Sequence, residues 1–164
     1  MKRIVIHWTA GTNKPCNTDL EHYHFIIDSA GRVYQGKYTP EDNLNCKDGK
    51  YAQHTGGGNT DSIGIALCGM YGFKNRTDVG KYPLSRIQCE RCFSLCAELC
   101  KKYNILPVTA NNVFTHYEFG QKNPKTTSYG KIDIIHLPPY PEISKDNIGK
   151  FIRTKVMWYL QRHN

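Results

Sequence analysis

The sequence lacks any hydrophobic run that is long enough to cross a lipid bilayer. Its longest apolar runs, such as Ile63 to Cys68, have the length of a strand and fall far below the roughly 20 residues of a spanning helix. At the N-terminus, Lys2 and Arg3 are followed by only three apolar residues before His7, whereas a secretory signal peptide needs an apolar stretch of about 7–15 residues. We therefore expect synthesis in the cytoplasm without a signal peptide, and no membrane insertion.

Internal repeats, low-complexity tracts and an obvious interdomain linker are also absent. The length of 164 residues suits one domain of the commonest size with a single core. Hydrophobic residues make up 39% and charged residues 22% of the chain, which is the composition of an ordinary soluble globular protein. We expect a single domain over residues 1–164.

Acidic residues are scarce relative to basic ones. The chain has 14 Asp and Glu against 22 Lys and Arg, a formal charge of +8, which favours polyanionic partners such as nucleic acid, anionic lipid or bacterial wall polymers. The basic residues are dispersed and no nucleic-acid recognition motif is present. Nucleic acid is therefore not an expected partner.

Seven cysteines are present, and four of them, Cys89, Cys92, Cys96 and Cys100, invite a metal-cluster interpretation. Their spacing places them on one stripe of a single helix, interleaved with leucines. A tetrahedral thiolate site usually takes its pairs of ligands from separate turns. We favour reduced, buried thiols that pack as small apolar side chains.

The apolar pattern predicts strands and helices in the order β, ββ, β, α, β, α, which is a mixed α/β (α+β) fold with a central mixed β-sheet flanked by helices. Residues 37–61 and 118–131 are expected to be loops. The expected strands cover residues 2–8, 22–27, 32–35, 62–69 and 113–116, and the expected helices cover residues 83–103 and 145–162.

Candidate metal ligands follow the ends of predicted strands. His7 follows one apolar segment, His116 follows another, and the triplet Lys131-Ile132-Asp133 lies in a later loop. A histidine at the rim of a sheet projects its imidazole from a rigid base, which suits metal ligation. Either histidine taken alone is more typical of a structural or surface residue, so the pairing is the informative feature.

Five segments together resemble the N-acetylmuramoyl-L-alanine amidase type 2 family, which includes phage endolysins, bacterial amidases of wall recycling and animal peptidoglycan recognition proteins. The segments occur in the family's order and extend from residue 3 to about residue 138. They are IVIHWTAG, YHFIIDSAGRVYQG, AQHTGGGNTDSIGIALCG, FTHYEFG and GKIDIIHLPP.

The resemblance implies a catalytic Zn²⁺ site. By position, the zinc ligands correspond to His7, His116 and Asp133, and two histidines with one carboxylate leave a fourth tetrahedral position open. Lys131 corresponds to a family lysine near the metal that helps to stabilise the oxyanion. His136 lies close enough to Asp133 in sequence to stay an alternative ligand.

Other site residues follow from the same resemblance. Some relatives carry a glutamate where this chain has Ala66, and phage-type members without it use the tyrosine that corresponds to Tyr23 to orient water. His54 is similar to a family histidine in the substrate groove, in a glycine-rich context that lets backbone approach a ligand. Trp8 and Thr9 directly follow the first ligand, and we expect them to contact substrate.

Three histidines, His22, His24 and His163, match none of the ligand positions. His24 is expected to face away from the site as a core residue, and His22 and His163 to have no metal role.

Two features of the sequence differ from the family pattern. Ile134 and Ile135 replace the proline-containing pair that follows the third ligand in many relatives. The short spacing from His7 to Tyr23 predicts a truncated or missing helix between the first two strands.

The expected function is hydrolysis of the amide bond between N-acetylmuramic acid and L-alanine in peptidoglycan by a monomeric, phage-type endolysin without a separate wall-binding domain. Such an enzyme needs another factor to reach the wall. A non-catalytic peptidoglycan-binding module and a cytoplasmic muropeptide-recycling amidase are the alternatives, although the latter is expected to carry the glutamate missing at Ala66.

Overall fold

The computed structural model describes residues 1–162 and contains one five-stranded sheet. The strand order is β3-β2-β4-β1-β5, with β1 in a central position. All neighbouring pairs are parallel except β2 and β3, which form the antiparallel hairpin expected from the sequence. The strands are β1 (Arg3–Trp8), β2 (Phe25–Ile27), β3 (Val33–Gln35), β4 (Ser62–Leu67) and β5 (Val113–Thr115).

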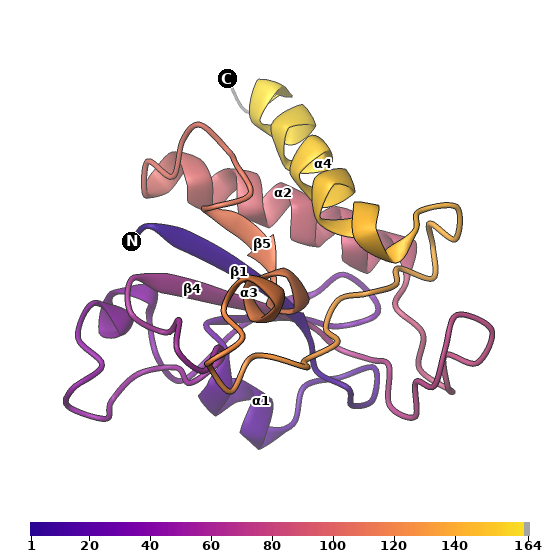
Figure 1. The fold of residues 1–164 in the computed structure, drawn as a ribbon, viewed down its shortest axis with the longest axis horizontal. Helices are drawn as coiled ribbons and strands as arrows, with labels where there is room; N and C mark the ends of the chain where they lie inside the picture. The colour runs from indigo at the N-terminus through magenta and orange to yellow at the C-terminus, as the bar shows by residue number, and fades with distance from the viewer. Residues whose placement is uncertain (163–164) are drawn as a thin grey trace.

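Helices cover the sheet and confirm the mixed α/β class (Figure 1). The two long helices, α2 and α4, lie together on one side of the sheet, and the short α1 lies on the other side. Among residues 1–162, none of the helices combines the length and hydrophobicity needed to cross a bilayer. The helices are α1 (Asn17–His22), α2 (Arg86–Lys102), α3 (His116–Lys122) and α4 (Ile148–Arg162), with 3₁₀ turns η1 (Pro40–Leu44) and η2 (Lys145–Asn147).

Alternation along β1 separates the two faces of the sheet. Ile4 and Ile6 point into the main core, which α2 and α4 cover, whereas Val5 packs with Phe114 and Phe119 in a second cluster. Side chains alternate across a strand, so His7 lies on the same face as Val5. The face away from the two long helices is therefore the one that carries the candidate ligand.

The four cysteines of α2 are buried free thiols that pack in the main core. Burial raises the pKa of the Cys100 thiol to about 12, which keeps it protonated. Within residues 1–162, the grouping of potential ligands that could hold a metal does not include any cysteine. The packing interpretation of these residues fits the structure.

Residues 118–131 were expected to be a loop, and this prediction is wrong for the first part of the segment. Helix α3 begins at His116, directly after β5, and continues to Lys122. The Thr115 hydroxyl accepts a hydrogen bond from the Glu118 amide, and the Glu118 carboxylate accepts one from the Thr115 amide. This capping box was visible in the sequence as Thr-His-Tyr-Glu, and it starts the helix without an extended apolar pattern.

Smaller differences concern boundaries and the first long loop. The hairpin strand begins at Phe25 because residues up to His22 form α1, a six-residue helix that fulfils the expected truncation. The 37–61 segment contains the 3₁₀ turn η1 and is anchored by the buried Asn43. Its side-chain amide donates to the carbonyls of Ala52 and Asn59, so hydrogen bonds within the segment hold the loop together.

Candidate metal centre

His7 and His116 converge because their strands are parallel neighbours. In the β1–β5 pair, Ile6 lies opposite Thr115, so His7 near the end of β1 and His116 directly after β5 lie side by side at the same end of the sheet. The centroids of the two imidazole rings are 4.7 Å apart. Strand pairing thus explains the pairing of histidines that the sequence suggested.

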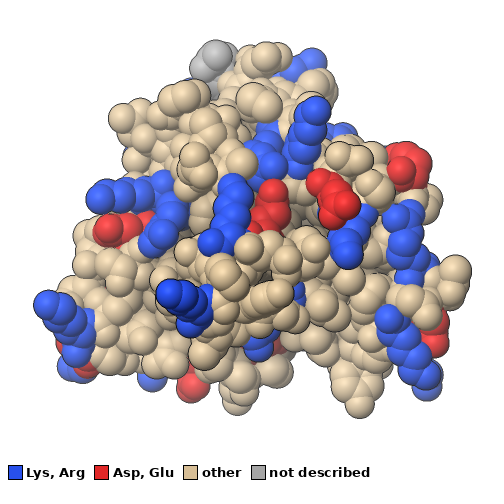
Figure 2. All heavy atoms as spheres, viewed as in Figure 1, with Lys and Arg blue, Asp and Glu red and all other residues tan. Residues whose placement is uncertain are grey.

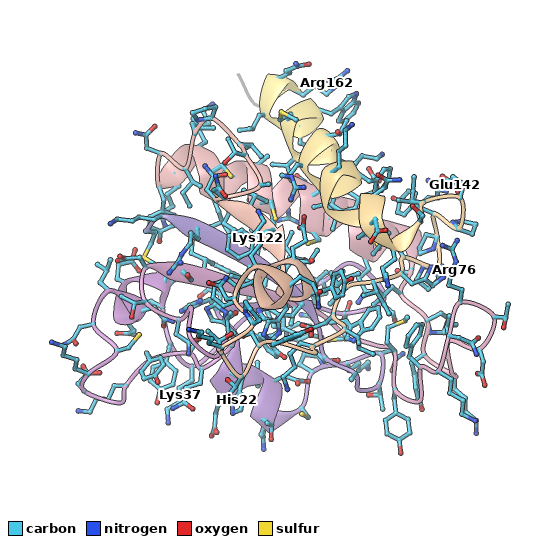
Figure 3. All side chains as sticks on the ribbon, viewed as in Figure 1. His22, Lys37, Arg76, Lys122, Glu142 and Arg162 are labelled. Atoms are coloured by element: carbon cyan, nitrogen blue, oxygen red, sulfur yellow. The ribbon has the colours of Figure 1, made fainter. Side chains whose placement is uncertain are left out.

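Asp133 joins them from the segment that follows α3. Its carbonyl oxygen accepts a hydrogen bond of 2.6 Å from the Tyr117 amide in the first turn of α3. Its Oδ2 atom lies 2.8 Å from Nδ1 of His7 and 3.1 Å from Nδ1 of His116. In Figure 3, the region around α3, between the labelled Lys122 and His22, is densely filled with side chains.

The electrostatic state of the triad suits a cation. Burial lowers the pKa of His7 to about 4, an effect that outweighs its hydrogen bond to Asp133, so the ring is neutral near pH 7. Burial raises the pKa of Asp133, but hydrogen bonds with His116 and His7 outweigh it and leave the pKa below its usual value. The triad therefore offers a neutral imidazole and an ionised carboxylate as ligands.

The donor set and spacing fit a zinc ion. The three ligand atoms all lie within 4.8 Å of one another. Bonds of about 2.0–2.2 Å to a tetrahedral ion place ligand atoms about 3.3 Å apart, near the separations of Oδ2 from the two Nδ1 atoms. Three protein ligands also leave one position open toward the adjacent groove, as catalytic zinc sites require.

The triad lies at a groove with a volume of about 580 Å³, and every predicted site residue except His7 lines it. Its lining includes Trp8, Thr9, Tyr23, His54, His116, Lys131 and Asp133, and His7 lies just beneath this lining with its side chain fully buried. Sequence reasoning therefore located the groove from residues that are up to 126 positions apart.

Tyr23 and Lys131 are far apart in the sequence, on either side of His116, and both line this groove. Tyr23 directly follows α1, and its ring centroid is 5.1 Å from that of His7. Burial raises the pKa of the Tyr23 hydroxyl above its usual value, so the group can donate a hydrogen bond but is not a base at neutral pH. Lys131 is exposed at the rim.

Ala66 lies opposite His7 in the β1–β4 register and is completely buried. Cross-strand partners in a parallel pair share one face of the sheet, so this is the position from which a longer acidic side chain would approach the site. Alanine has no polar group to offer there, whereas the Tyr23 ring lies 5.1 Å from that of His7.

Trp8 and Thr9 line the groove and pack against the protein around it. Trp8 is only 4% exposed and packs against Phe73, with ring centroids 5.1 Å apart. The Thr9 hydroxyl oxygen accepts hydrogen bonds from the amides of Gly11 and Gly69. Both residues shape the groove, and their contact with substrate stays a prediction.

His54 lies behind His7 and is 6% exposed. Its Nδ1 atom is 2.7 Å from the Thr55 hydroxyl oxygen and 3.3 Å from Nε2 of His7, and its Nε2 atom is 3.2 Å from the Ser62 carbonyl oxygen. Burial lowers the pKa of His54 well below its usual value. The structure thus gives this histidine a set of protein partners, while its role in binding substrate stays a prediction.

Sequence reasoning missed two hydroxyl residues at the site. The Thr55 oxygen lies 3.3 Å from Nε2 of His7, and the Ser128 oxygen lies 2.9 Å from Nε2 of His116. Thr55 had a weak signal, since it follows His54 directly in the HTGGG stretch. Ser128 had none, because it lies in a loop whose sequence, KTTSYG, gives no reason to choose one hydroxyl over its neighbours.

The glycines of HTGGG have a packing role. A Cβ atom on Gly56 would lie 1.8 Å from the Thr127 hydroxyl oxygen, and one on Gly58 would lie 2.6 Å from the Phe119 ring. The sequence suggested that these glycines let backbone approach a ligand, and in the structure they let this segment pack closely against α3 and the loop that carries Ser128. Glycine permits that approach because it has no Cβ atom.

The other histidines lie outside the ligand set. The neutral, buried His24 accepts the Gly64 amide hydrogen at Nδ1 and contacts Asn43 through Nε2, in agreement with a core role. The expectation that it faces away from the site is wrong, since its ring centroid is 5.5 Å from that of His54, which contacts His7. In the part of the chain that the structure describes, the possible metal group is His7, His116 and Asp133, without His136. His22 is exposed at the end of α1, and His163 lies outside the described residues.

Comparison with known structures finds the same fold in amidases and peptidoglycan recognition proteins. A glutamate-to-alanine variant of PlyL superposes with a TM-score of 0.53 and 18% identity, covering 95% of this chain and 84% of that one. E. coli AmiD has a TM-score of 0.50 and 22% identity over 75% of this chain and 51% of its own, and Drosophila peptidoglycan recognition protein SD has a TM-score of 0.50 and 17% identity over 77% and 74%.

Sequence comparison gives the family itself. No curated protein sequence matches the chain closely enough to count as a relative. The family profile described as N-acetylmuramoyl-L-alanine amidase matches residues 1–130, which include His7, Tyr23, His54 and His116 and end one residue before Lys131. Because that match covers most of its length, the chain belongs to the N-acetylmuramoyl-L-alanine amidase family.

Proposed function

We propose that the protein is a zinc-dependent hydrolase of the amide bond between N-acetylmuramic acid and L-alanine in peptidoglycan. The observation that carries this proposal is the convergence of His7, His116 and Asp133 in a groove of a chain that belongs to the amidase family. AmiD, which shares the fold, has been solved with a substrate in which anhydro-N-acetylmuramic acid is joined to L-Ala-D-γ-Glu-L-Lys.

His7, His116 and Asp133 would hold the zinc ion, which would supply a Lewis acid for the scissile carbonyl and would lower the pKa of water toward neutrality. Lys131, at the rim of the groove, places its ammonium group where negative charge develops on the carbonyl oxygen as water adds. The Tyr23 hydroxyl stays protonated and orients the attacking water by hydrogen bonding. Cleavage of the C–N bond leaves a lactyl carboxylate, and the released L-alanine nitrogen takes a proton.

The biological setting we propose is that of a phage-type lytic amidase, acting as a monomer on the wall after another factor gives it access. Ala66 supports this setting, since the glutamate expected of a recycling enzyme is absent from the position opposite His7. The excess of basic residues supports adhesion to an anionic wall.

The decisive experiment measures release of L-alanine amino termini from purified sacculi and from soluble muropeptides. Protein loaded with zinc should release them, and protein stripped by a chelator should recover activity when zinc is restored. Asp133→Ala should be inactive and should bind zinc poorly, while Asp146→Ala, an exposed carboxylate on η2, should match the wild type.

Two other outcomes would change the assignment. Wall binding without turnover, unchanged by His7→Ala, would indicate the non-catalytic binding module. Turnover of soluble muropeptides with no action on sacculi would indicate a recycling amidase.

A further inference from the structure

Each ligand histidine can present either ring nitrogen to a metal, and the hydrogen-bond partner of the other nitrogen decides which one it presents. In this chain, both Nδ1 atoms face Asp133, so both Nε2 atoms face protein groups. The donors and acceptors around those Nε2 atoms can be assigned from chemistry alone, because each chain of hydrogen bonds ends on a backbone carbonyl oxygen.

The series of hydrogen bonds behind His116 is the simpler of the two. Nε2 of His116 lies 2.9 Å from the Ser128 hydroxyl oxygen, which lies 2.7 Å from the Gly56 carbonyl oxygen. A carbonyl can only accept, so the single hydroxyl hydrogen of Ser128 is committed to Gly56. Ser128 must then accept from His116, which places a ring hydrogen on Nε2. When zinc takes the place of the hydrogen that Nδ1 would otherwise share with Asp133, the Nδ1 lone pair is left for the metal.

The series of hydrogen bonds behind His7 contains one more residue. Nε2 of His54 must donate to the Ser62 carbonyl oxygen, 3.2 Å away, so the neutral His54 ring has a lone pair on Nδ1. That lone pair accepts from the Thr55 hydroxyl at 2.7 Å, and the Thr55 oxygen is then free to accept from Nε2 of His7 at 3.3 Å. Nδ1 of His54 is also 3.3 Å from Nε2 of His7, but the Thr55 hydroxyl already occupies its single lone pair, so the Thr55 oxygen is the acceptor for the His7 hydrogen.

We propose that Ser128 and the Thr55–His54 pair are positioning residues that hold His116 and His7 with hydrogen on Nε2, so that both Nδ1 lone pairs face the zinc ion. The inference rests on the proposed zinc site and assigns roles to three residues that do not themselves touch the metal. It also gives His54 a function beyond the groove: it sets the direction of the hydrogen bonds behind His7.

The backbone around these hydroxyls is built to keep them in place. The Asn59 side-chain oxygen accepts from the amides of His54 and Thr55, at 3.0 and 2.8 Å, which closes the turn that presents the Thr55 hydroxyl. Gly56 packs directly on Thr127, so the carbonyl that orients Ser128 and Ser128 itself are carried by two touching segments. The HTGGGN stretch is therefore a support for both ligand histidines.

The first test measures zinc affinity by competition with a chromophoric chelator at fixed pH. Ser128→Ala and Thr55→Val should each weaken zinc binding about 10–100-fold, since loss of a partner behind a ligating histidine typically has that effect. Thr55→Ser, which keeps the hydroxyl, should restore affinity to near the wild-type value. Thr154→Val removes an exposed hydroxyl of α4, which bonds to the Lys150 carbonyl, and should leave affinity unchanged.

The second test reads the hydrogens directly, by ¹⁵N–¹H NMR of the imidazole rings in the zinc-loaded protein. Wild-type His7 and His116 should both carry hydrogen on Nε2 and bind through Nδ1, and circular dichroism should show that each variant is folded. A merely structural role for the hydroxyls would lower the unfolding temperature without changing zinc affinity or the ring assignments.

The outcomes separate this inference from the proposed function. Wild-type protein that binds no zinc would overturn both. Wild-type protein that binds zinc and cleaves peptidoglycan, with Ser128→Ala and Thr55→Val variants of unchanged zinc affinity, would overturn the positioning roles alone. A wild-type ring with hydrogen on Nδ1 would do the same.

Discussion

The residues of this site are of common types, and burial and neighbouring groups set their charge states. His7 is neutral near pH 7 because burial opposes its charged form, and Asp133 keeps its charge because two histidines contact it. Lys131 differs from both, since it is exposed and keeps its mobility at the rim of the groove. Its proposed contribution therefore depends on charge near the reacting carbonyl and not on burial.

Substitution of Lys131 tests that contribution. Lys131→Met keeps the length of the side chain and removes its charge, so kcat should fall about 100-fold, the typical effect of removing one oxyanion-stabilising group, with a smaller change in KM. Zinc content should be unchanged. Lys125→Met, which alters an exposed lysine of the same loop, is the control, and a kcat for Lys131→Met equal to that control would exclude the role.

At the scale of elements, helix α3 fixes the position of His116, and Glu118 fixes α3. The Glu118 carboxylate caps the helix through the Thr115 amide and forms a two-point ion pair with Arg153 of α4, with N–O distances of 3.0 and 3.1 Å. Gly149 of α4 lies against the same carboxylate, and a Cβ atom there would come within 2.2 Å of it. The start of α4 is thus shaped to admit the cap of α3.

This packing reverses the usual effect of a glycine-to-alanine change in a helix. In an exposed helix such a change stabilises by about 1 kcal/mol, but Gly149→Ala should lower the free energy of unfolding by about 1–3 kcal/mol because it overpacks a buried contact. Urea denaturation gives the value, with Lys150→Ala, an exposed α4 position, as control.

A double-mutant cycle locates the cause. When Glu118→Ala has already removed the carboxylate, Gly149→Ala should cost much less than it does alone. Equal costs in the two backgrounds would show that the effect arises elsewhere in α4.

At the scale of the whole molecule, the candidate metal centre joins parts of the chain that are far apart in sequence. His7 lies near the start of the chain in β1, whereas His116 and Asp133 come from segments after the long helix α2. Basic side chains are spread over the visible face and outnumber acidic ones (Figure 2), which suits diffuse attraction to an anionic polymer more than one focused docking site.

Metal removal should therefore weaken the whole fold. At a free zinc concentration about 100 times Kd, binding adds about 2.7 kcal/mol to stability, which corresponds to a rise in Tm of about 5–10 °C for a chain of this size. Differential scanning fluorimetry with and without a chelator measures the shift. Asp133→Ala should melt at the same temperature in both conditions, and a wild-type Tm that ignores the chelator would count against the zinc site.

Much of the architecture was predictable from local pattern. The apolar runs located all five strands and both long helices, and the order of elements gave the mixed sheet. Helix α3 escaped because its seven residues carry too little apolar periodicity, and only the capping box between Thr115 and Glu118 marked it. Boundaries shifted by a few residues for the same reason, since capping contacts decide where a helix begins.

The sequence by itself predicted which residues gather at the candidate site, because His7, Tyr23, His116, Lys131 and Asp133 lie in motifs whose order can be read along the chain. Only the tertiary structure decided what stands behind them. Ser128 reaches His116 by the contact of its loop with Gly56, 72 positions away, and His54 meets His7 because β1 and β4 are paired. Such contacts depend on strand pairing and close loop packing, which leave no local pattern in the residues that they join.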